Sequence, residues 1–234
     1  MTRLIRADVL KLRRRTGMLA VVALFVFGSV AAYFGAGLFL DEGGDFQTAT
    51  GVLTLIAAVA GAIIGATAGG ADIESGVFRD LVATGRSRTA LFFSRVPAAW
   101  LLTLGMLTLA VIVSALLSSP SAGEFGRGLA SVLVSGALTA AVCVGLAALT
   151  GKSGPVMGIA LAFQLGVAPL LAQLDVLGNA RWAIPSVAIS RLDGSEGSEG
   201  ILASLPLAGA IAIILAWAAA GLGGGLWRTR TQEI

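Results

Sequence analysis

The residues that could carry out chemistry are few, and the most suggestive stand together at Gly151–Lys152–Ser153–Gly154. A phosphate-binding loop reads GxxxxGK(S/T), whereas five residues separate Gly145 from Gly151, and an apolar run precedes them instead of a strand. The same residues match GxSG, but a serine nucleophile needs a neighbouring base and the chain contains no His. We therefore predict no catalytic residue and no nucleotide-binding site in this chain.

Metal and redox chemistry also lack the residues that they need. The absence of His removes every site built on imidazole ligands. Cys143 is the single Cys, so neither an internal disulfide nor a cluster of Cys ligands can form. We predict that the chain itself binds no metal and no cofactor.

The composition explains this shortage of polar chemistry. Soluble domains carry roughly 25% charged residues and about 45–50% apolar ones. This chain of 234 residues carries 12% charged and 56% hydrophobic residues. A membrane is the usual environment for a chain of this kind.

Six runs of the sequence contain no Asp, Glu, Lys or Arg, and each is long enough to cross a bilayer as a helix. A charge at the centre of such a helix costs about 2.5–3.5 kcal/mol, so six consecutive charge-free runs indicate spans. We predict an all-α integral membrane protein with a single domain, 1–234. The six expected spans are about 17–40, 47–71, 96–118, 129–150, 154–174 and 201–226.

The distribution of Lys and Arg predicts the orientation of these spans. Six spans place both termini on one side, which then holds thirteen of the sixteen basic residues. Because basic residues favour the cytoplasmic side, both termini are expected to be cytoplasmic. The Arg-rich, Ala- and Gly-rich usage is typical of a GC-rich bacterial genome and points to a plasma membrane.

The first sixteen residues predict an amphipathic helix lying on the membrane surface. Its apolar stripe contains Ile5, Val9 and Leu12 at helical spacing. Basic residues, among them Arg6, Arg13 and Arg14, occupy the remaining faces. The alternative is a plain basic anchor that only fixes orientation.

The loop 72–95 between the second and third spans predicts a second amphipathic helix, Ile73–Ala83. Ile73, Val77, Phe78 and Leu81 repeat at helical spacing, while Glu74, Arg79 and Asp80 lie on other faces. An apolar stripe outside the bilayer needs a cover, which is either a protein partner or the lipid surface. The acidic residues favour a partner, because a lipid-facing helix usually has a basic polar side.

Two further features concern packing. Gly61, Gly65 and Gly69 recur every four residues in the second span, which is typical of close helix association, although the 32 Gly residues make chance recurrence common. The outer segment 172–200 between the fifth and sixth spans is amphipathic. We expect it to lie at the headgroup level or to fold back into the protein.

The chain resembles the membrane subunit, or permease, of type 2 export-class ATP-binding-cassette (ABC) transporters. Four features carry the resemblance: the opening LIRADVLKLRRRTG, the loop between the second and third spans, the six-span layout with both ends inside, and the amphipathic outer segment. In that loop, Glu74, Gly76, Arg79 and Leu81 precede the basic stretch ATGRSRTALFFSR, similar to the family's coupling loop.

The resemblance implies a pair of permease protomers, identical or sister subunits, bound to two copies of a cytoplasmic ATPase that holds ATP and magnesium. It implies export of a hydrophobic or amphipathic substrate such as a drug, antibiotic, peptide or lipid-like molecule, and no nucleic acid. It assigns Thr54, Phe163 and Gln164 to the pathway. The residues coupling to the ATPase would be Ile73, Glu74, Gly76, Val77, Phe78, Arg79, Asp80 and Leu81. The alternative is a non-transporting membrane assembly or anchoring factor that recruits a cytoplasmic partner.

Overall fold

The computed structural model describes residues 1–39, 44–193 and 205–231, and over these ranges every regular element is a helix. The α-helices are α1 (Thr2–Arg13), α2 (Thr16–Phe39), α3 (Phe46–Glu74), α4 (Val77–Ala83), α5 (Arg88–Ser118), α6 (Ala122–Thr150), α7 (Ser153–Ala162), α8 (Ala168–Gln173), α9 (Pro185–Asp193) and α10 (Leu207–Thr231). A π-helix, η1 (Phe163–Val167), joins α7 to α8, and a 3₁₀ segment, η2 (Asp175–Ala183), precedes α9.

Six helices of the described chain are long and apolar enough to cross a membrane, which confirms the expected number of spans. They are Thr16–Leu38, Phe46–Glu74, Arg88–Ser118, Ala122–Thr150, Ser153–Gln173 and Leu207–Thr231. The shortest has 21 residues, which at 1.5 Å per residue is enough for the hydrocarbon core of about 30 Å. The chain is therefore a multi-pass membrane protein.

The helices extend beyond the charge-free runs that predicted them. The third span begins at Arg88 rather than at 96, where Ser87 accepts a hydrogen bond from the Ala90 N–H at 3.2 Å. The fourth begins at Ala122 behind a capping box of Ser121 and Glu124. Capping residues determine where a helix begins, whereas the first charged residue indicates only where the helix leaves the hydrocarbon core of the bilayer. The expected end at 40 and start at 201 lie outside the described residues.

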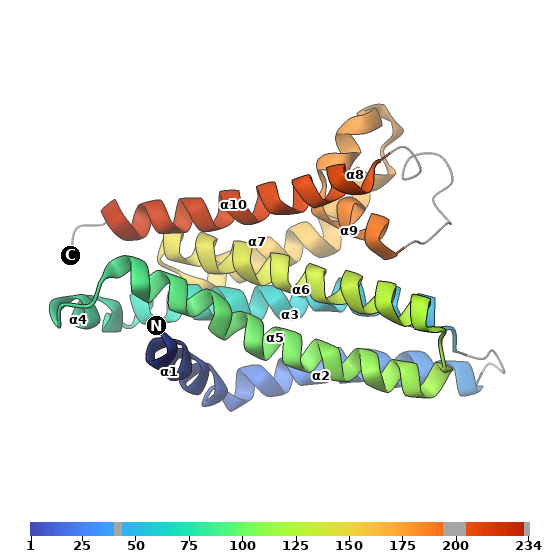
Figure 1. The fold of residues 1–234 in the computed structure, drawn as a ribbon, viewed down its shortest axis with the longest axis horizontal. Helices are drawn as coiled ribbons and strands as arrows, with labels where there is room; N and C mark the ends of the chain where they lie inside the picture. The colour runs from blue at the N-terminus through green and yellow to red at the C-terminus, as the bar shows by residue number, and fades with distance from the viewer. Residues whose placement is uncertain (40–43, 194–204, 232–234) are drawn as a thin grey trace.

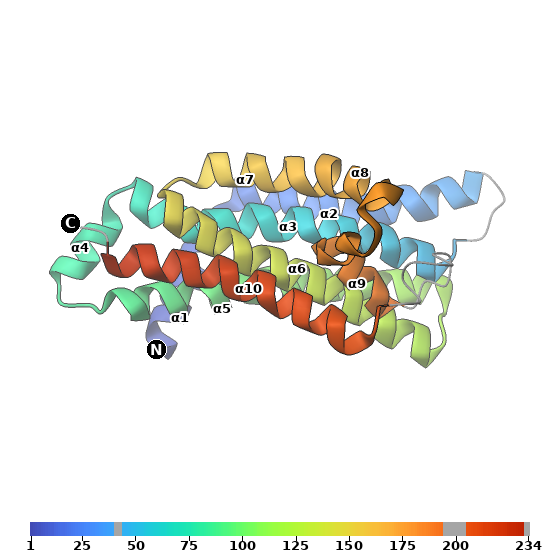
Figure 2. The same cartoon turned by 90° about the horizontal axis from the view of Figure 1, so that it is seen from above.

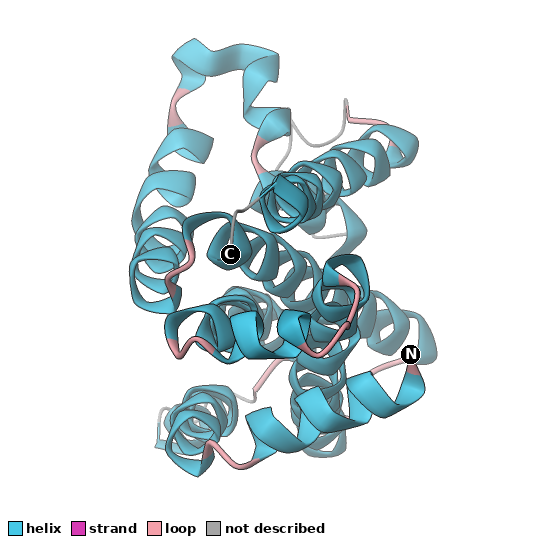
Figure 3. Cartoon of the chain, turned by 90° about the vertical axis from the view of Figure 1, so that its left-hand side faces the viewer, coloured by secondary structure: helices cyan, strands magenta, loops and turns pink. Residues whose placement is uncertain are grey.

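Helices α3 and α6 form the centre of the bundle (Figures 1 and 2). In the most apolar stretch of each, 67% of residues are buried, against 11% in the fifth span and 6% in α10. Figure 3, viewed from the end that carries α4, shows α1 lying across the ends of the other helices. The peripheral spans therefore present most of their apolar surface to their surroundings.

The glycine stripe of α3 lies against α6. A Cβ atom at Gly61 would stand 2.6 Å from the carbonyl oxygen of Gly136, a distance that real Cβ atoms do not reach. Gly65 and Gly69 meet the carbonyl oxygens of Ala140 and Val144 just as closely. Only glycine permits this approach, so the stripe holds two helices of one chain together.

The fifth span differs from the uninterrupted helix expected over 154–174. Residues 163–167 form the π-helix η1, and single π turns occur often at functional sites. Beyond it, α9 folds back and packs against α6 and α10. The Nε atom of Arg191 donates to the carbonyl oxygen of Leu205 at 3.0 Å, which ties α9 to the start of the last span.

Candidate functional site

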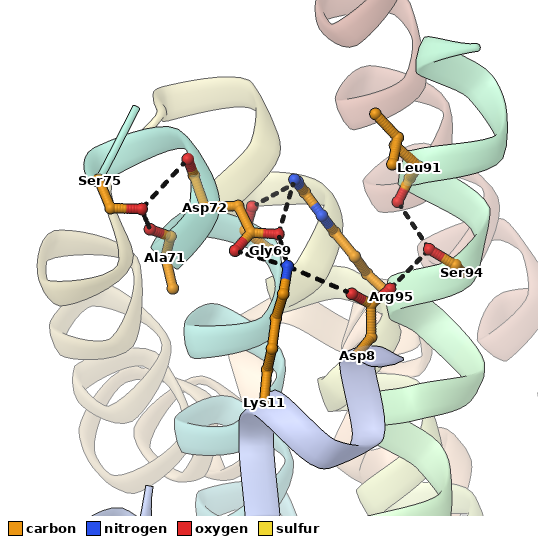
Figure 4. Close-up of polar contacts among 9 residues, drawn as sticks. All are labelled: Asp8, Lys11, Gly69, Ala71, Asp72, Ser75, Leu91, Ser94 and Arg95. Carbon is orange, nitrogen blue, oxygen red and sulfur yellow. Dashed lines mark hydrogen bonds and ion pairs between the residues drawn. The ribbon is translucent and has the colours of Figure 1, made fainter. Parts of the chain in front are cut away.

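A cluster of charged side chains surrounds Arg95 in the first turns of α5 (Figure 4). Its Nη1 atom donates to the carbonyl oxygen of Gly69 at 2.9 Å, and Nη2 lies 3.6 Å from Oδ2 of Asp72. The ring of Phe78 lies against the same guanidinium, with 5.1 Å between Cζ and the ring centroid. The Arg95 side chain is 3% exposed, so its charge depends on these three groups for stabilisation.

Helix α1 adds Asp8 and Lys11 to this cluster. Oγ of Ser94 donates to Oδ2 of Asp8 at 2.6 Å, and Nζ of Lys11 lies 3.1 Å from Oδ2 of Asp72 and 3.8 Å from Oδ1 of Asp8. Figure 4 shows these groups converging from α1, α3 and α5. We call Asp8, Lys11, Asp72, Ser94 and Arg95 the charge cluster.

The environment of Asp8 changes its acidity. Burial raises the pKa of the Asp8 carboxyl above its ordinary 3.8, while the hydrogen bond from Ser94 and the charges of Lys11 and Arg95 act in the opposite direction. A cavity of about 50 Å³ lies beside the cluster, lined by residues that include Asp8, Lys11, Asp72 and Arg95. Its size allows one or two water molecules among groups that can bind them.

The apolar stripe of α1 faces the bundle. Leu12 is buried, and Ile5 and Val9 are half-buried, as α1 packs against α5. The basic residues Arg6, Arg13 and Arg14 are exposed. The charge cluster explains this placement, because Asp8 and Lys11 stand beside the stripe and bond to residues of α3 and α5.

The short helix α4 begins four residues later than the expected Ile73–Ala83. Ile73 and Glu74 are the last residues of α3, and a turn at Ser75 and Gly76 separates them from α4. Gly76 has φ +77°, a left-handed conformation that residues with side chains disfavour. Apolar spacing does not reveal such a turn, because it records residue types and not the backbone path.

Helix α4 buries one residue and exposes most of the rest. Phe78 is buried against Arg95, and Leu81 is half-buried. Val77, Arg79 and Asp80 are exposed, and we call these three residues the α4 face. The helix therefore touches the spans through its apolar residues and presents both signs of charge outward.

Glu74 links the second span to the fifth. Its Oε1 accepts a hydrogen bond from the backbone N–H of Ser153 at 2.6 Å, and Oε2 accepts one from Ser153 Oγ at 2.9 Å. Because α7 begins at Ser153, the carboxylate satisfies an N–H that has no partner within the helix and carries the charge sign that a helix start favours.

An apolar cavity of about 220 Å³ lies between α6, α7, η1 and α10, with Pro185 of α9 at its edge. Phe163 and Gln164 line it from η1, and Trp217 lines it from α10. Nε2 of Gln164 donates to Oγ1 of Thr139, another lining residue, at 3.3 Å. Two of the three expected pathway residues therefore meet at one cavity.

Thr54, the third expected pathway residue, lies elsewhere. Its Oγ1 donates to the carbonyl oxygen of Thr50 at 2.8 Å and lies 3.3 Å from Oγ of Ser131. These contacts place it between α3 and α6, away from the residues that line the apolar cavity. In this single chain, Thr54 contributes to helix packing.

Sequence reasoning missed the charge cluster. Arg95 stands at the edge of a charge-free run, where an Arg is ordinary, so its position in the sequence carries no sign of burial. Asp8 is the one acidic residue among the basic residues of the first helix, and that exception was the available signal. The sequence around Ser153 contains no signal of its contact with Glu74, because the two residues are 79 positions apart.

Within the described residues, no group of three or more His, Cys, Asp or Glu side chains is arranged to hold a metal ion. The polar groups that do converge join helices, because each carboxylate of the charge cluster has a cation or hydroxyl partner on another helix. No family model matches the chain, and no curated protein shows significant similarity to it.

Proposed function

We propose that this chain is the membrane subunit of an ATP-driven ABC-type exporter in a plasma membrane. The chain pairs with a second permease protomer, and two copies of a separate cytoplasmic ATPase supply the energy from ATP and magnesium. The cargo is hydrophobic or amphipathic. Direction and subunit organisation come from the resemblance of the N-terminal helix and the α3–α4 region to the type 2 export class.

The observation that supports this proposal most directly is the construction of α4. A seven-residue helix outside the spans has little stability of its own, and here one buried ring holds it against Arg95. Its α4 face carries Arg79 and Asp80 beside the exposed Val77. Such a mixed surface fits a protein groove better than an anionic lipid surface.

One contact of α4 and one contact of the adjoining end of α3 are placed in a way that suits energy coupling. Phe78 contacts Arg95, which is bonded to α3 and lies near α1, so a displacement of α4 acts on the charge cluster. Glu74, at the other side of the Gly76 turn, caps the span that carries Phe163 and Gln164. A partner that moves α4 would thus act on both the third and the fifth spans.

The test is to capture the partner at the α4 face. A photo-crosslinking amino acid replaces Asp80 in one variant and Gly123, at the opposite end of the bundle, in another, and each full-length chain is purified from its native membrane. We expect the variant at 80 to yield an adduct with a subunit that hydrolyses ATP. An adduct at 123 alone, or none at 80, would contradict the proposal.

Charge reversal provides the matched functional test. R79E combined with D80K reverses both charges of the α4 face and should abolish co-purification of the ATPase while the chain still inserts. R127E, at an exposed position in the first turns of α6 at the opposite end of the bundle, is the control and should retain it. A non-transporting anchoring factor, the alternative, would bring down a partner that lacks ATPase activity.

A further inference from the structure

The apolar cavity lies at the middle of the membrane-spanning region. Gln164 is the twelfth residue of the span that begins at Ser153, which places it about 16 Å along that helix. Half of a hydrocarbon core is about 15 Å, so the cavity stands near the bilayer centre. Trp217 enters it from the middle of α10.

The cavity also reaches the surface of the bundle. Its lining residues Ile159 and Trp217 are 67% and 38% exposed, and they belong to α7 and α10, the two least-covered regions of the spans. At this depth, any part of the α7–α10 face that the second protomer does not cover meets lipid hydrocarbon. A molecule can therefore enter sideways between α7 and α10 without crossing water.

The volume and the lining residues of the apolar cavity limit the ligands that it can hold. A cavity of about 150 Å³ accommodates benzene, whereas pockets for drug-sized ligands span about 300–1,000 Å³. The present 220 Å³ lies between these values, which suits a chain or a single ring. None of the described lining residues is charged, so they offer an ionised group no partner.

We propose that this cavity binds one uncharged hydrocarbon chain inserted between α7 and α10. Among the described lining residues, the indole N–H of Trp217 is already bonded to the carbonyl oxygen of Ala183, so a hydroxyl or carbonyl on the chain is recognised at the Gln164–Thr139 pair. This proposal names the class of cargo for the transport function proposed above. Only the identification of the bound chain as cargo rests on that function. Binding itself requires no ATPase.

Contact quenching of Trp217 tests binding on the permease chain alone. A full-length variant keeps Trp217 as its single Trp (W100F, W182F and W227F) and is reconstituted in phosphatidylcholine vesicles. In one arm the lipid acyl chains carry bromine at mid-chain. In the other, a long-chain alcohol brominated at mid-chain is added to unbrominated vesicles. Bromine quenches Trp emission on contact, so each arm reports a brominated chain beside Trp217, either inside the cavity or on the exposed face of the ring.

A160F distinguishes the cavity from ordinary lipid contact, because Ala160 lines the cavity and a ring there fills it. A162F is the matched control, since Ala162 is exposed on the same helix and outside the lining. We expect A160F to lose most of the quenching and A162F to keep it. V142F fills the cavity from α6 and repeats the test if A160F does not fold.

Equal quenching in the filled and control variants would overturn the proposal, as would no quenching in either arm. Quenching by lipid alone identifies a bilayer acyl chain as the ligand, and quenching by the alcohol identifies a free amphiphile. Either result stands whether or not an ATPase is captured at the α4 face, so the two proposals can fail separately.

Discussion

A buried arginine stabilises a fold only while its partners are present. Arg95 is bonded to Gly69, faces Asp72 and lies against Phe78, and none of these groups is its neighbour in sequence. Its Nη2 atom makes no hydrogen bond within the described chain and relies on the ion pair at 3.6 Å. The charge cluster is thus sensitive to the loss of any one member.

R95M tests this sensitivity. It leaves Asp72 with Lys11 as its remaining basic partner and deprives the buried carbonyl oxygen of Gly69 of its donor, so we expect a loss of about 1–3 kcal/mol in the free energy of unfolding. R95M with D72N should be less destabilised than the two single changes together predict, because both charges leave at once. Thermal unfolding in detergent measures the cycle.

The control for this cycle is R86M. Arg86 is exposed, so its replacement should change the free energy of unfolding by no more than about 0.5 kcal/mol. If R95M and R86M unfold at the same temperature, the cluster contributes nothing to stability.

At the scale of elements, the helix–helix contact of α3 with α6 depends on the absence of side chains. G65A would press a Cβ atom into the backbone of Ala140, and overpacking of this kind costs about 1–3 kcal/mol. The same change at Gly105 of α5 meets nothing within 4 Å. G105A should be neutral or stabilising, because alanine favours the helix.

Equilibrium unfolding of G65A and G105A in the same detergent tests whether α3 and α6 are in close contact. A lower midpoint for G65A with an unchanged or higher one for G105A supports the close contact. Equal midpoints would mean that α3 and α6 lie farther apart than the structure has them.

The helices also show which parts of the fold can be predicted from the sequence. The six spans were predictable because hydrocarbon excludes charge along a whole helix, and charge is visible residue by residue. The turn at Gly76 and the π-helix at 163–167 were not, because both are backbone geometries with no distinctive spacing. The pairing of Glu74 with Ser153 depends on tertiary placement, and so does that of Arg95 with Asp72.

For the whole molecule, the orientation in the membrane is the property to measure. The end of the bundle that carries α4 holds most of the Lys and Arg residues, and basic residues remain on the cytoplasmic side. The carbonyl oxygen of Arg230 accepts a hydrogen bond from Nη1 of Arg88 at 3.3 Å, which places the end of α10 at the same end.

Cysteine labelling in intact cells checks this orientation. In a C143A background, R86C reports the α4 end and G123C the opposite end; both positions are exposed. A membrane-impermeant maleimide should label G123C in intact cells and R86C only after the cells are opened. The C143A parent sets the background signal. The reverse pattern would place α4 outside and remove the basis for a cytoplasmic partner.

The central position of α3 and α6 has a consequence for biosynthesis. The two helices are not adjacent in the chain, so residues 75–150 must be synthesised after α3 before its glycine stripe meets its complete partner. At roughly 5–20 residues per second, that stripe waits on the order of 4–15 s in the bilayer. A nascent chain interrupted before residue 136 would leave the stripe uncovered, a mark by which membrane quality control can recognise an unfinished protein.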